Sequence, residues 1–432
     1  MDFEMQRLEP GMMARYDIED HRPARVNSVQ FGMSEALLGA VDRLIDDARL
    51  DIGIACVDVN ATGFADKLNA QSGLYTLIVR GYVNDEAVRR EQVAQCVLTA
   101  CGPEGIDDLA RDPHIEFGIV DDDECARTMA KQFNERRQNE GLAPVFMIQL
   151  GVNALADSLA FRSESDEAAR LCAGMNYLDD MLYICEPYAR LTLCAPEDFR
   201  ARFPLDHAEG VSFIDEAGLL LAQRLRSQVF DAGLFLMAAA GWLNGCDTLS
   251  DCMKHERLRK FVGEGFTEEV MPAISDVDRQ TVERAVIDSF GRYENPLNRN
   301  RILRAADHLI GRFARGVLPI IRRLNDENFE PPRRLSFALA ATIMLYAGAR
   351  PGKDERFEVA RGRQTETLHD DDHVLEGFAT LAHDMPPESL AYATLADREL
   401  WGADLRDIDG LEARVALDIA NMQREPGYLP GE

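Results

Sequence analysis

The sequence lacks several features that would place it in other classes of protein. No apolar run approaches the roughly 20 residues that a membrane-spanning helix needs, and the acidic segment 1–9 lacks the basic-then-apolar order of a signal peptide. Basic charge is also scarce, with 47 Lys and Arg against 75 Asp and Glu, and the net charge of -28 repels nucleic acid and anionic lipid. We therefore expect a cytoplasmic protein that binds neither nucleic acid nor membrane.

Paired metal-binding cysteines are missing as well. The nine cysteines include no Cys-x-x-Cys pair, so their spacing indicates neither a zinc site nor a redox dithiol. Cys246 and Cys252 lie near His255, but nothing in the spacing supplies an oriented base for a nucleophilic thiolate. We expect them to be buried structural thiols.

The chain is long enough for two or three domains, and its pattern changes near residue 216. Beyond that point, long amphipathic periods predict helices, and residues 350–364 are polar enough for a surface loop. Before it, short β-rich runs alternate with helical patterns, which predicts a parallel sheet with helices on both faces. These runs lie at 26–31, 52–59, 74–79, 115–120 and 145–150. The predicted fold is an α/β Rossmann-like, doubly wound domain over 1–215, followed by an all-α domain over 216–432.

Six segments together resemble one family of dehydrogenases. They are VQFG at 29–32, KLNAQSGLYT at 67–76, EEVMP at 268–272, RYENP at 292–296, VLP at 317–319 and RLSFALA at 334–340. In order and spacing they are similar to the long-chain family of mannitol dehydrogenase and the hexuronate reductases, tagaturonate reductase most of all. The resemblance covers most of the chain except roughly 121–217, where this chain is shorter. It implies a cleft that binds NAD(H) and an open-chain sugar acid or polyol, with no metal.

The turn after the first predicted strand departs from the family pattern, which reads Gly-x-Gly-Asn-Phe-x-Arg. Gly32 remains, but Ser34, Glu35 and Leu38 replace the second Gly, the Asn and the Arg. A pyrophosphate binds at this helix N-terminus, where a glutamate is itself stabilised and would compete for the place. The turn is therefore either a structural strand-turn-helix or a weakened dinucleotide site, and we favour the former.

Three other residues occupy positions where a cofactor would bind. Asp58 could accept hydrogen bonds from an adenosine ribose, which favours NAD over NADP, or it could be a solvated loop acid. In the relatives, Gln71 and Tyr75 lie by the cofactor cleft, but here they also fit an ordinary buried strand. The candidate cofactor set is Gly32, Ser34, Asp58, Gln71 and Tyr75, with NAD as the expected cofactor and no metal.

The catalytic motif of the family is also replaced. The family pattern of Lys, four residues, Asn, two residues and His falls on Arg226, Asp231 and Leu234. The family's Lys is a general base and its Asn and His polarise the oxyanion, whereas Arg stays protonated, Asp donates no hydrogen bond and Leu is apolar. Losing one such group usually costs about 10²–10⁴ in rate. The substituted catalytic positions are Arg226 and Asp231, for which an ion pair is the structural alternative.

Other family positions are altered too. Arg299 and Asn300 stand where relatives carry Lys and His, Arg312 replaces a later Lys, and the acidic run 121–124 replaces a polar turn. That run could bind a hard cation, but we favour a solvated turn. Likewise, the four-residue spacing of two histidines in 369–373 suits a metal, but we favour a loop followed by an Asp-rich helix N-terminus.

These observations leave three hypotheses. We favour a protein of this family whose ancestral reaction was NAD-linked reduction of a keto-hexuronate or oxidation of a polyol, and which is now impaired or inactive. An active enzyme using Asp231 as base and Arg226 as the cation facing its substrate is the first alternative. A non-catalytic binding or regulatory subunit is the second, either as a homo-oligomer or paired with a paralogue.

Overall fold

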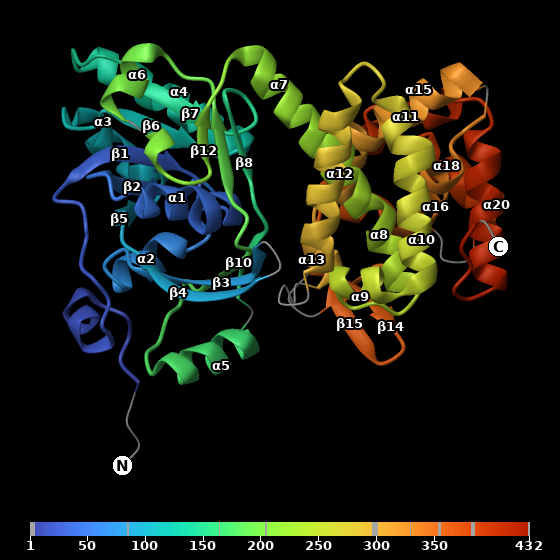
Figure 1. Cartoon of the computed structure of the whole chain (residues 1–432), viewed down its shortest axis with the longest axis horizontal. Coiled ribbons are helices and arrows are strands. Elements are labelled where there is room, and N and C mark those ends of the chain that lie inside the picture. Colours follow the sequence, from blue (N-terminus) through green and yellow to red (C-terminus); the bar gives the residue numbers. More distant parts are fainter. Residues whose placement is uncertain are drawn as a thin grey trace. The chain divides into compact units, whose positions relative to one another are not determined.

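The computed structural model describes residues 5–83, 86–163, 165–203, 205–295, 301–328, 330–352, 356–381 and 385–430. The chain divides into two compact units, Met1–Gln223 and Arg224–Glu432 (Figure 1). The predicted boundary at 215/216 falls at the start of helix α7 (Glu216–Leu225). In the described part of the chain, no helix has the length and apolar character that crossing a bilayer requires.

A five-stranded parallel sheet forms the centre of the first unit. Its strands are β1 (Val26–Phe31), β2 (Gly53–Val57), β5 (Val97–Cys101), β6 (Phe117–Val120) and β7 (Phe146–Gln149), in the order β5-β2-β1-β6-β7. This arrangement confirms the predicted Rossmann-like fold. The strand order reverses between β1 and β6, and ligands of open α/β sheets bind at the carboxyl ends of strands at such a reversal.

Helices cover both faces of this sheet. The helices α3 (Ile106–Arg111) and α4 (Glu124–Asn139) lie on one side, and α1 (Asp42–Asp47) with the preceding π-helix η2 (Leu37–Val41) and α2 (Phe64–Ala70) on the other (Figure 1). Each side buries its own apolar cluster. One cluster joins Phe31 and Val57 to Phe133, while the other joins Ile54 to Leu44 and Leu68.

The prediction for 74–79 was right about a strand and wrong about its sheet. That segment is β3 (Tyr75–Val83), which pairs antiparallel with β4 (Glu86–Ala94). With β10 (Tyr183–Cys185) and β9 (Ala160–Arg162) it makes a separate sheet, and β5 takes the expected place in the parallel sheet. A short buried apolar run shows that a strand is present but not which strands pair with it. A third sheet contains β8 (Ala154–Asp157), β11 (Arg190–Leu193) and β12 (Val211–Phe213). The unit also has the helices α5 (Ser165–Met175) and α6 (Glu197–Arg202) and the 3-10 helices η1 (Pro10–Tyr16), η3 (Pro103–Gly105) and η4 (Leu205–His207).

The second unit is helix-rich, as predicted, and is built around the apolar helices α8 (Ala232–Leu243) and α16 (Arg333–Ala347). Three π-helical segments interrupt its helices: η5 (Arg226–Asp231), η6 (Phe266–Val270) and η7 (Phe313–Val317). The other α-helices are α9 (Leu249–Lys254), α10 (Glu256–Gly265), α11 (Met271–Ala273), α12 (Arg279–Glu294), α13 (Ile302–Ala305), α14 (Leu309–Arg312), α15 (Leu318–Asn328), α17 (Asp372–Ala379), α18 (Pro387–Leu395), α19 (Arg398–Trp401) and α20 (Leu411–Arg424).

The unit is not purely helical, and the prediction of a surface loop at 350–364 is wrong. This region contributes to a small antiparallel sheet of β13 (Arg350–Pro351), β14 (Phe357–Arg361) and β15 (Gln364–Thr367). Its polar sequence misled the prediction because strands that bury little surface keep mostly polar side chains.

A buried acid in the first unit makes the stability of the fold depend on pH. Asp42 is 0% exposed, and one carboxylate oxygen accepts a hydrogen bond from the Tyr75 hydroxyl at 3.0 Å. The other oxygen has no hydrogen-bond partner. Burial raises the pKa of Asp42 to about 7, despite the lowering effect of the hydrogen bonds from Tyr75 and Gln30.

Because folding raises this pKa, the protonated carboxyl is the form that the folded state favours. The stability is present below the unfolded pKa of about 4 and is lost as pH rises toward about 7, a change on the order of 4 kcal/mol. We expect Asp42→Asn to remove this pH dependence, so that the variant gains stability over the natural chain from pH 5 to pH 8. Denaturant unfolding at each pH measures the difference, and parallel curves for the two proteins would contradict the assignment.

Candidate functional site

Gly32 begins the turn that follows β1 and needs the conformational freedom of glycine. Its φ is +107°, and a Cβ atom there would lie 2.7 Å from Cβ of Asp121. Asp121 follows β6, so these two residues meet where the strand order of the sheet reverses. The turn after β1 therefore lies close to the side chain of Asp121 at the end of β6.

Asp121 occupies the place where this turn would meet an anion. Its carboxylate lies close to the hydroxyl and the backbone N–H of Ser34, which lower its pKa, but burial outweighs them and raises the pKa above the usual range of an Asp. Ser34 in turn caps the helix, since its Oγ accepts a hydrogen bond from Leu37 N–H at 3.3 Å. An acid of the chain itself thus lies beside a backbone N–H that a pyrophosphate would use.

We expected Glu35 to be the acid that competes for the anion position at this turn, but the acid found there is Asp121. A carboxylate oxygen of Glu35 accepts a hydrogen bond from Arg162 N–H in β9 at 2.9 Å. The interpretation of 121–124 as a solvated turn holds for Asp122 and Glu124, which are exposed, and in part for Asp121 and Asp123, which are half-buried. Asp122 pairs with Arg127 at 2.7 Å, and Asp123 caps α4.

The other candidate cofactor residues bond to groups within the first unit. Asp58 lies at the end of β2, is 3% exposed, and accepts hydrogen bonds from Thr62 and Phe64 at 2.9–3.1 Å. The amide of Gln71 donates to Leu74 O at 2.8 Å, and the Tyr75 hydroxyl donates to Leu38 O at 2.9 Å. The structure therefore brings Gly32 and Ser34 together, but holds Asp58, Gln71 and Tyr75 inside the fold.

In the second unit, the predicted ion pair between Arg226 and Asp231 is confirmed. Both residues belong to η5, and one carboxylate oxygen of Asp231 accepts a hydrogen bond from the Arg226 guanidinium. The same oxygen accepts another from Arg312, which precedes η7. Gly316 lets the two π-helices approach, because a Cβ there would lie 2.2 Å from Ser227 O.

These charges form one continuous network. The Arg312 guanidinium also donates to the Asp307 carboxylate at 2.6 Å and to its carbonyl at 2.7 Å. Burial would raise the pKa of Asp231, but the guanidiniums of Arg226 and Arg312 outweigh it and hold the pKa below its usual value. Asp231 is therefore an anion at neutral pH, with its side chain 12% exposed.

Leu234, at the third family position, has no polar side-chain atom that could join this network. Leu234 lies in α8 and is 0% exposed. Arg299 and Asn300, the replaced Lys-His pair, lie outside the described residues. Sequence reasoning treated Arg312 as one more lost Lys and missed it as a partner of Asp231, because a sequence separation of 81 leaves no local signal.

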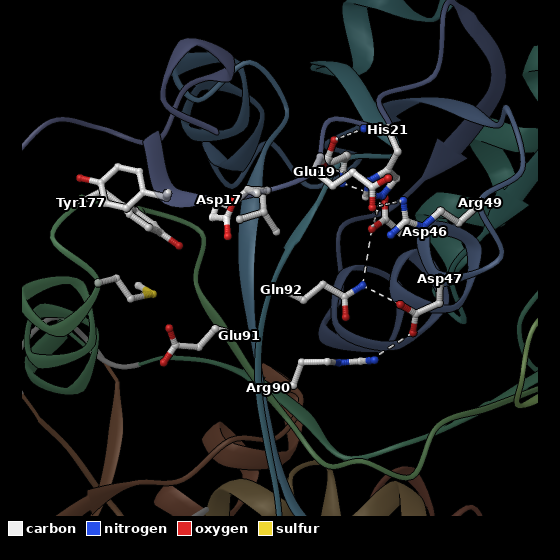
Figure 2. A pocket seen from close by; sticks show the side chains of 15 residues that line it. Asp17, Glu19, His21, Asp46, Asp47, Arg49, Arg90, Glu91, Gln92 and Tyr177 are labelled. Atoms are coloured by element: carbon white, nitrogen blue, oxygen red, sulfur yellow. Dashed lines mark hydrogen bonds and ion pairs between the residues drawn. The ribbon is translucent and has the colours of Figure 1, made fainter. Parts of the chain in front are cut away.

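The first unit also has a cavity of about 500 Å³ that none of the predicted site residues line (Figure 2). The N-terminal segment, the end of α1 and β4 form its walls. Three pairs of side chains lie along its wall: His21 with Asp46 at 3.1 Å, Arg49 with Glu19 at 2.9 Å and Arg90 with Asp47 at 3.3 Å. The cavity is therefore separate from the positions that the family uses.

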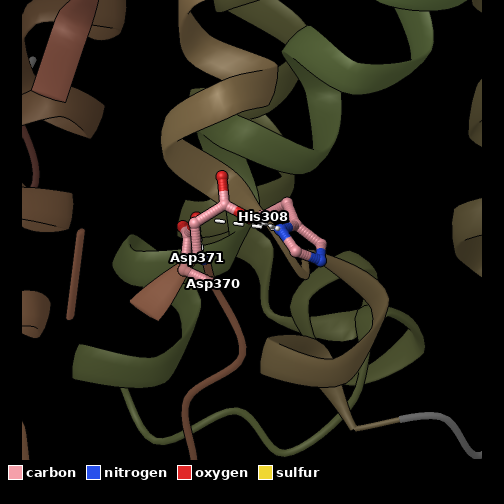
Figure 3. A group of neighbouring side chains, drawn as sticks. All are labelled: His308, Asp370 and Asp371. Atoms are coloured by element: carbon pink, nitrogen blue, oxygen red, sulfur yellow. Dashed lines mark hydrogen bonds and ion pairs between the residues drawn. The ribbon is translucent and has the colours of Figure 1, made fainter. Parts of the chain in front are cut away.

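The predicted loop and Asp-rich helix start at 369–373 are confirmed, since Asp371 is the N-cap of α17 and Asp372 lies in its first turn. The metal alternative weighed there paired His369 with His373. Among the described residues, the group that could hold a metal ion joins Asp370 and Asp371 to His308 instead (Figure 3). Cys246 and Cys252 are 5% and 0% exposed, as expected for buried thiols.

Breaking the network at Asp231 should destabilise the protein strongly. Asp231→Asn removes the carboxylate that two buried guanidiniums share, which we expect to cost about 3–5 kcal/mol of unfolding free energy. The control is Asp276→Asn, which removes an acid that also binds two arginines but is 51% exposed. We expect the control to cost under about 1 kcal/mol. Denaturant unfolding compares them, and equal losses would contradict the network.

Comparisons with known proteins agree on one family. Residues 229–423 match the mannitol dehydrogenase C-terminal domain. Altronate oxidoreductase from Yersinia enterocolitica is 25% identical, covering 90% of this chain and 92% of the relative. The enzyme of the same name from Bacillus subtilis is 22% identical, covering 96% and 95%.

Two solved structures show the same fold. A ternary complex of Pseudomonas fluorescens mannitol 2-dehydrogenase with NAD and D-mannitol has a TM-score of 0.75 at 13% identity, with 98% of each chain covered. A substrate-free D-sorbitol dehydrogenase has a TM-score of 0.65 at 14% identity, covering 98% of this chain and 99% of that one.

Proposed function

Because this chain belongs to the mannitol dehydrogenase family, with altronate oxidoreductases among its relatives, we propose that it keeps their scaffold but is impaired in their reaction. The ancestral reaction in this proposal is NAD-linked reduction of a keto-hexuronate, or the matching oxidation of a sugar acid or polyol. What has been lost is the proton transfer and oxyanion stabilisation at the reacting carbon.

The observation that carries the proposal is the state of Asp231. Hydride transfer to or from a carbon that bears oxygen needs a group that takes or gives a proton near the working pH. Asp231 is buried and held ionised by Arg226 and Arg312, and an arginine does not give up its proton. With Leu234 apolar, none of the three family positions can move a proton at neutral pH.

The same state argues against the alternative in which Asp231 is the base. A base for this step has a pKa near the pH of the reaction, whereas the neighbouring guanidiniums lower that of Asp231. The role of a non-catalytic binding or regulatory subunit, as a homo-oligomer or with a paralogue, stays a prediction.

The cofactor in this proposal is NAD, bound weakly. The Asp121 carboxyl group already lies beside the hydroxyl and the backbone N–H of Ser34, so a pyrophosphate would have to displace it from the turn. Metal ions play no part in the proposed ancestral hydride transfer.

Activity assays test the proposal. We expect the purified chain to turn over tagaturonate, fructuronate or mannitol with NAD(H) at least about 10⁴-fold more slowly than an active altronate oxidoreductase, because several catalytic groups are absent together. The assay follows nicotinamide absorbance with the active relative as the positive control. Turnover within tenfold of that control would overturn the proposal.

A nucleotide titration tests the cofactor turn separately. We expect Asp121→Asn to bind NADH at least about tenfold more tightly than the natural chain, a gain of about 1.4 kcal/mol from removing one facing charge. The matched control is Asp108→Asn, which neutralises an acid that is 92% exposed on α3. Calorimetry measures the affinities, and equal effects of the two substitutions would show that Asp121 does not block the turn.

A further inference from the structure

The described part of the second unit brings one imidazole and two carboxylates together outside the family's catalytic positions (Figure 3). His308 lies between α13 and α14, and Asp370 and Asp371 directly precede α17. A backbone hydrogen bond from His308 N–H to His369 O, at 3.0 Å, joins the two segments. This connection fixes the side chains near one another independently of any ligand.

The distances within this group are those of ion pairs, and they also suit ligands of one metal ion. Nδ1 of His308 lies 3.4 Å from Oδ1 of Asp371 and 3.9 Å from Oδ1 of Asp370. Protein hydrogen bonds from nitrogen to oxygen are about 2.7–3.2 Å long. Two ligands on one tetrahedral ion, each about 2.0–2.2 Å from it, lie about 3.4 Å apart. An ion shared by all three atoms would therefore fit with small adjustments.

Asp370 is held in place by its surroundings. Its side chain is 1% exposed, and Oδ2 accepts hydrogen bonds from the Tyr346 hydroxyl at 2.5 Å and from Ile310 N–H at 3.2 Å. Hydrogen bonds of this kind orient metal ligands and hold them ready for the ion. The side chains of His308 and Asp371 are 53% and 59% exposed, which leaves the other side of the group open to water.

We propose that His308, Asp370 and Asp371 bind one divalent transition-metal ion, with zinc bound more tightly than manganese or magnesium and with water completing its coordination. A nitrogen ligand beside carboxylates favours zinc over the harder ions. The ion would connect the α13–α14 loop to the start of α17 and stabilise the second unit by binding its folded form. This role is independent of hydride transfer.

Zinc titration of the full chain, after removal of metal by a chelator, tests the site. We expect saturable binding of one Zn²⁺ by calorimetry and a zinc-dependent rise in the unfolding temperature. His308→Asn and Asp371→Asn should each weaken binding at least about tenfold. At position 308, Asn tolerates the left-handed backbone, whose φ is 48°. At position 371, Asn is a favoured N-cap residue, as is the Asp that it replaces.

The matched control is His373→Asn, which removes an exposed histidine close in sequence but outside the group. It should bind zinc like the natural chain. Unfolding without zinc, followed for all variants, shows whether each is folded before its titration. Two results would overturn the proposal: no saturable zinc binding by the natural chain, or binding that survives both substitutions in the group.

Discussion

A buried carboxylate held between two guanidiniums is the interaction on which the rest of the second unit's chemistry depends. Asp231 binds Arg226 within its own π-helix and Arg312 from the next, and Arg312 extends the network to Asp307. Relative to the family pattern, the Asn-to-Asp change at position 231 adds a buried anion, and the two neighbouring cations compensate for its burial. Once the set is complete, it stabilises the fold and leaves no group that exchanges a proton at neutral pH.

The first unit shows the same preference for internal partners. The Asp121 carboxyl group lies beside Ser34, and Asp58 accepts hydrogen bonds from its own loop, so these polar groups near the turn after β1 have partners within the protein. The close contacts that packing needs are still present. Gly32 lies against the Asp121 side chain and Gly316 against the Ser227 backbone, at distances that a Cβ atom would prevent. This pattern is expected of a chain that must still fold but no longer has to catalyse the family's reaction.

The sequence predicted the elements with local signals and missed those that depend on distant pairing. Alternating strands and helices, the ion pair five residues apart and the Asp-rich helix start were all found, because each is encoded within a few turns of chain. The second sheet around β3, the contact of Asp121 with Ser34, and the bond of Arg312 to Asp231 join residues far apart in sequence. Which acid meets which donor then depends on tertiary packing that periodicity does not contain.

The most direct test of the central claim is to titrate the Asp231 carboxyl itself. Carbon-13 labelling of the aspartates, with Asp231→Asn to assign the signal, reports its ionisation by NMR. Our account predicts that the signal stays that of an ionised carboxylate from about pH 8 down to about pH 5, because both guanidiniums stabilise the charge. A midpoint between about pH 6 and pH 8 would contradict it, since a carboxyl titrating there could still serve as a catalytic base.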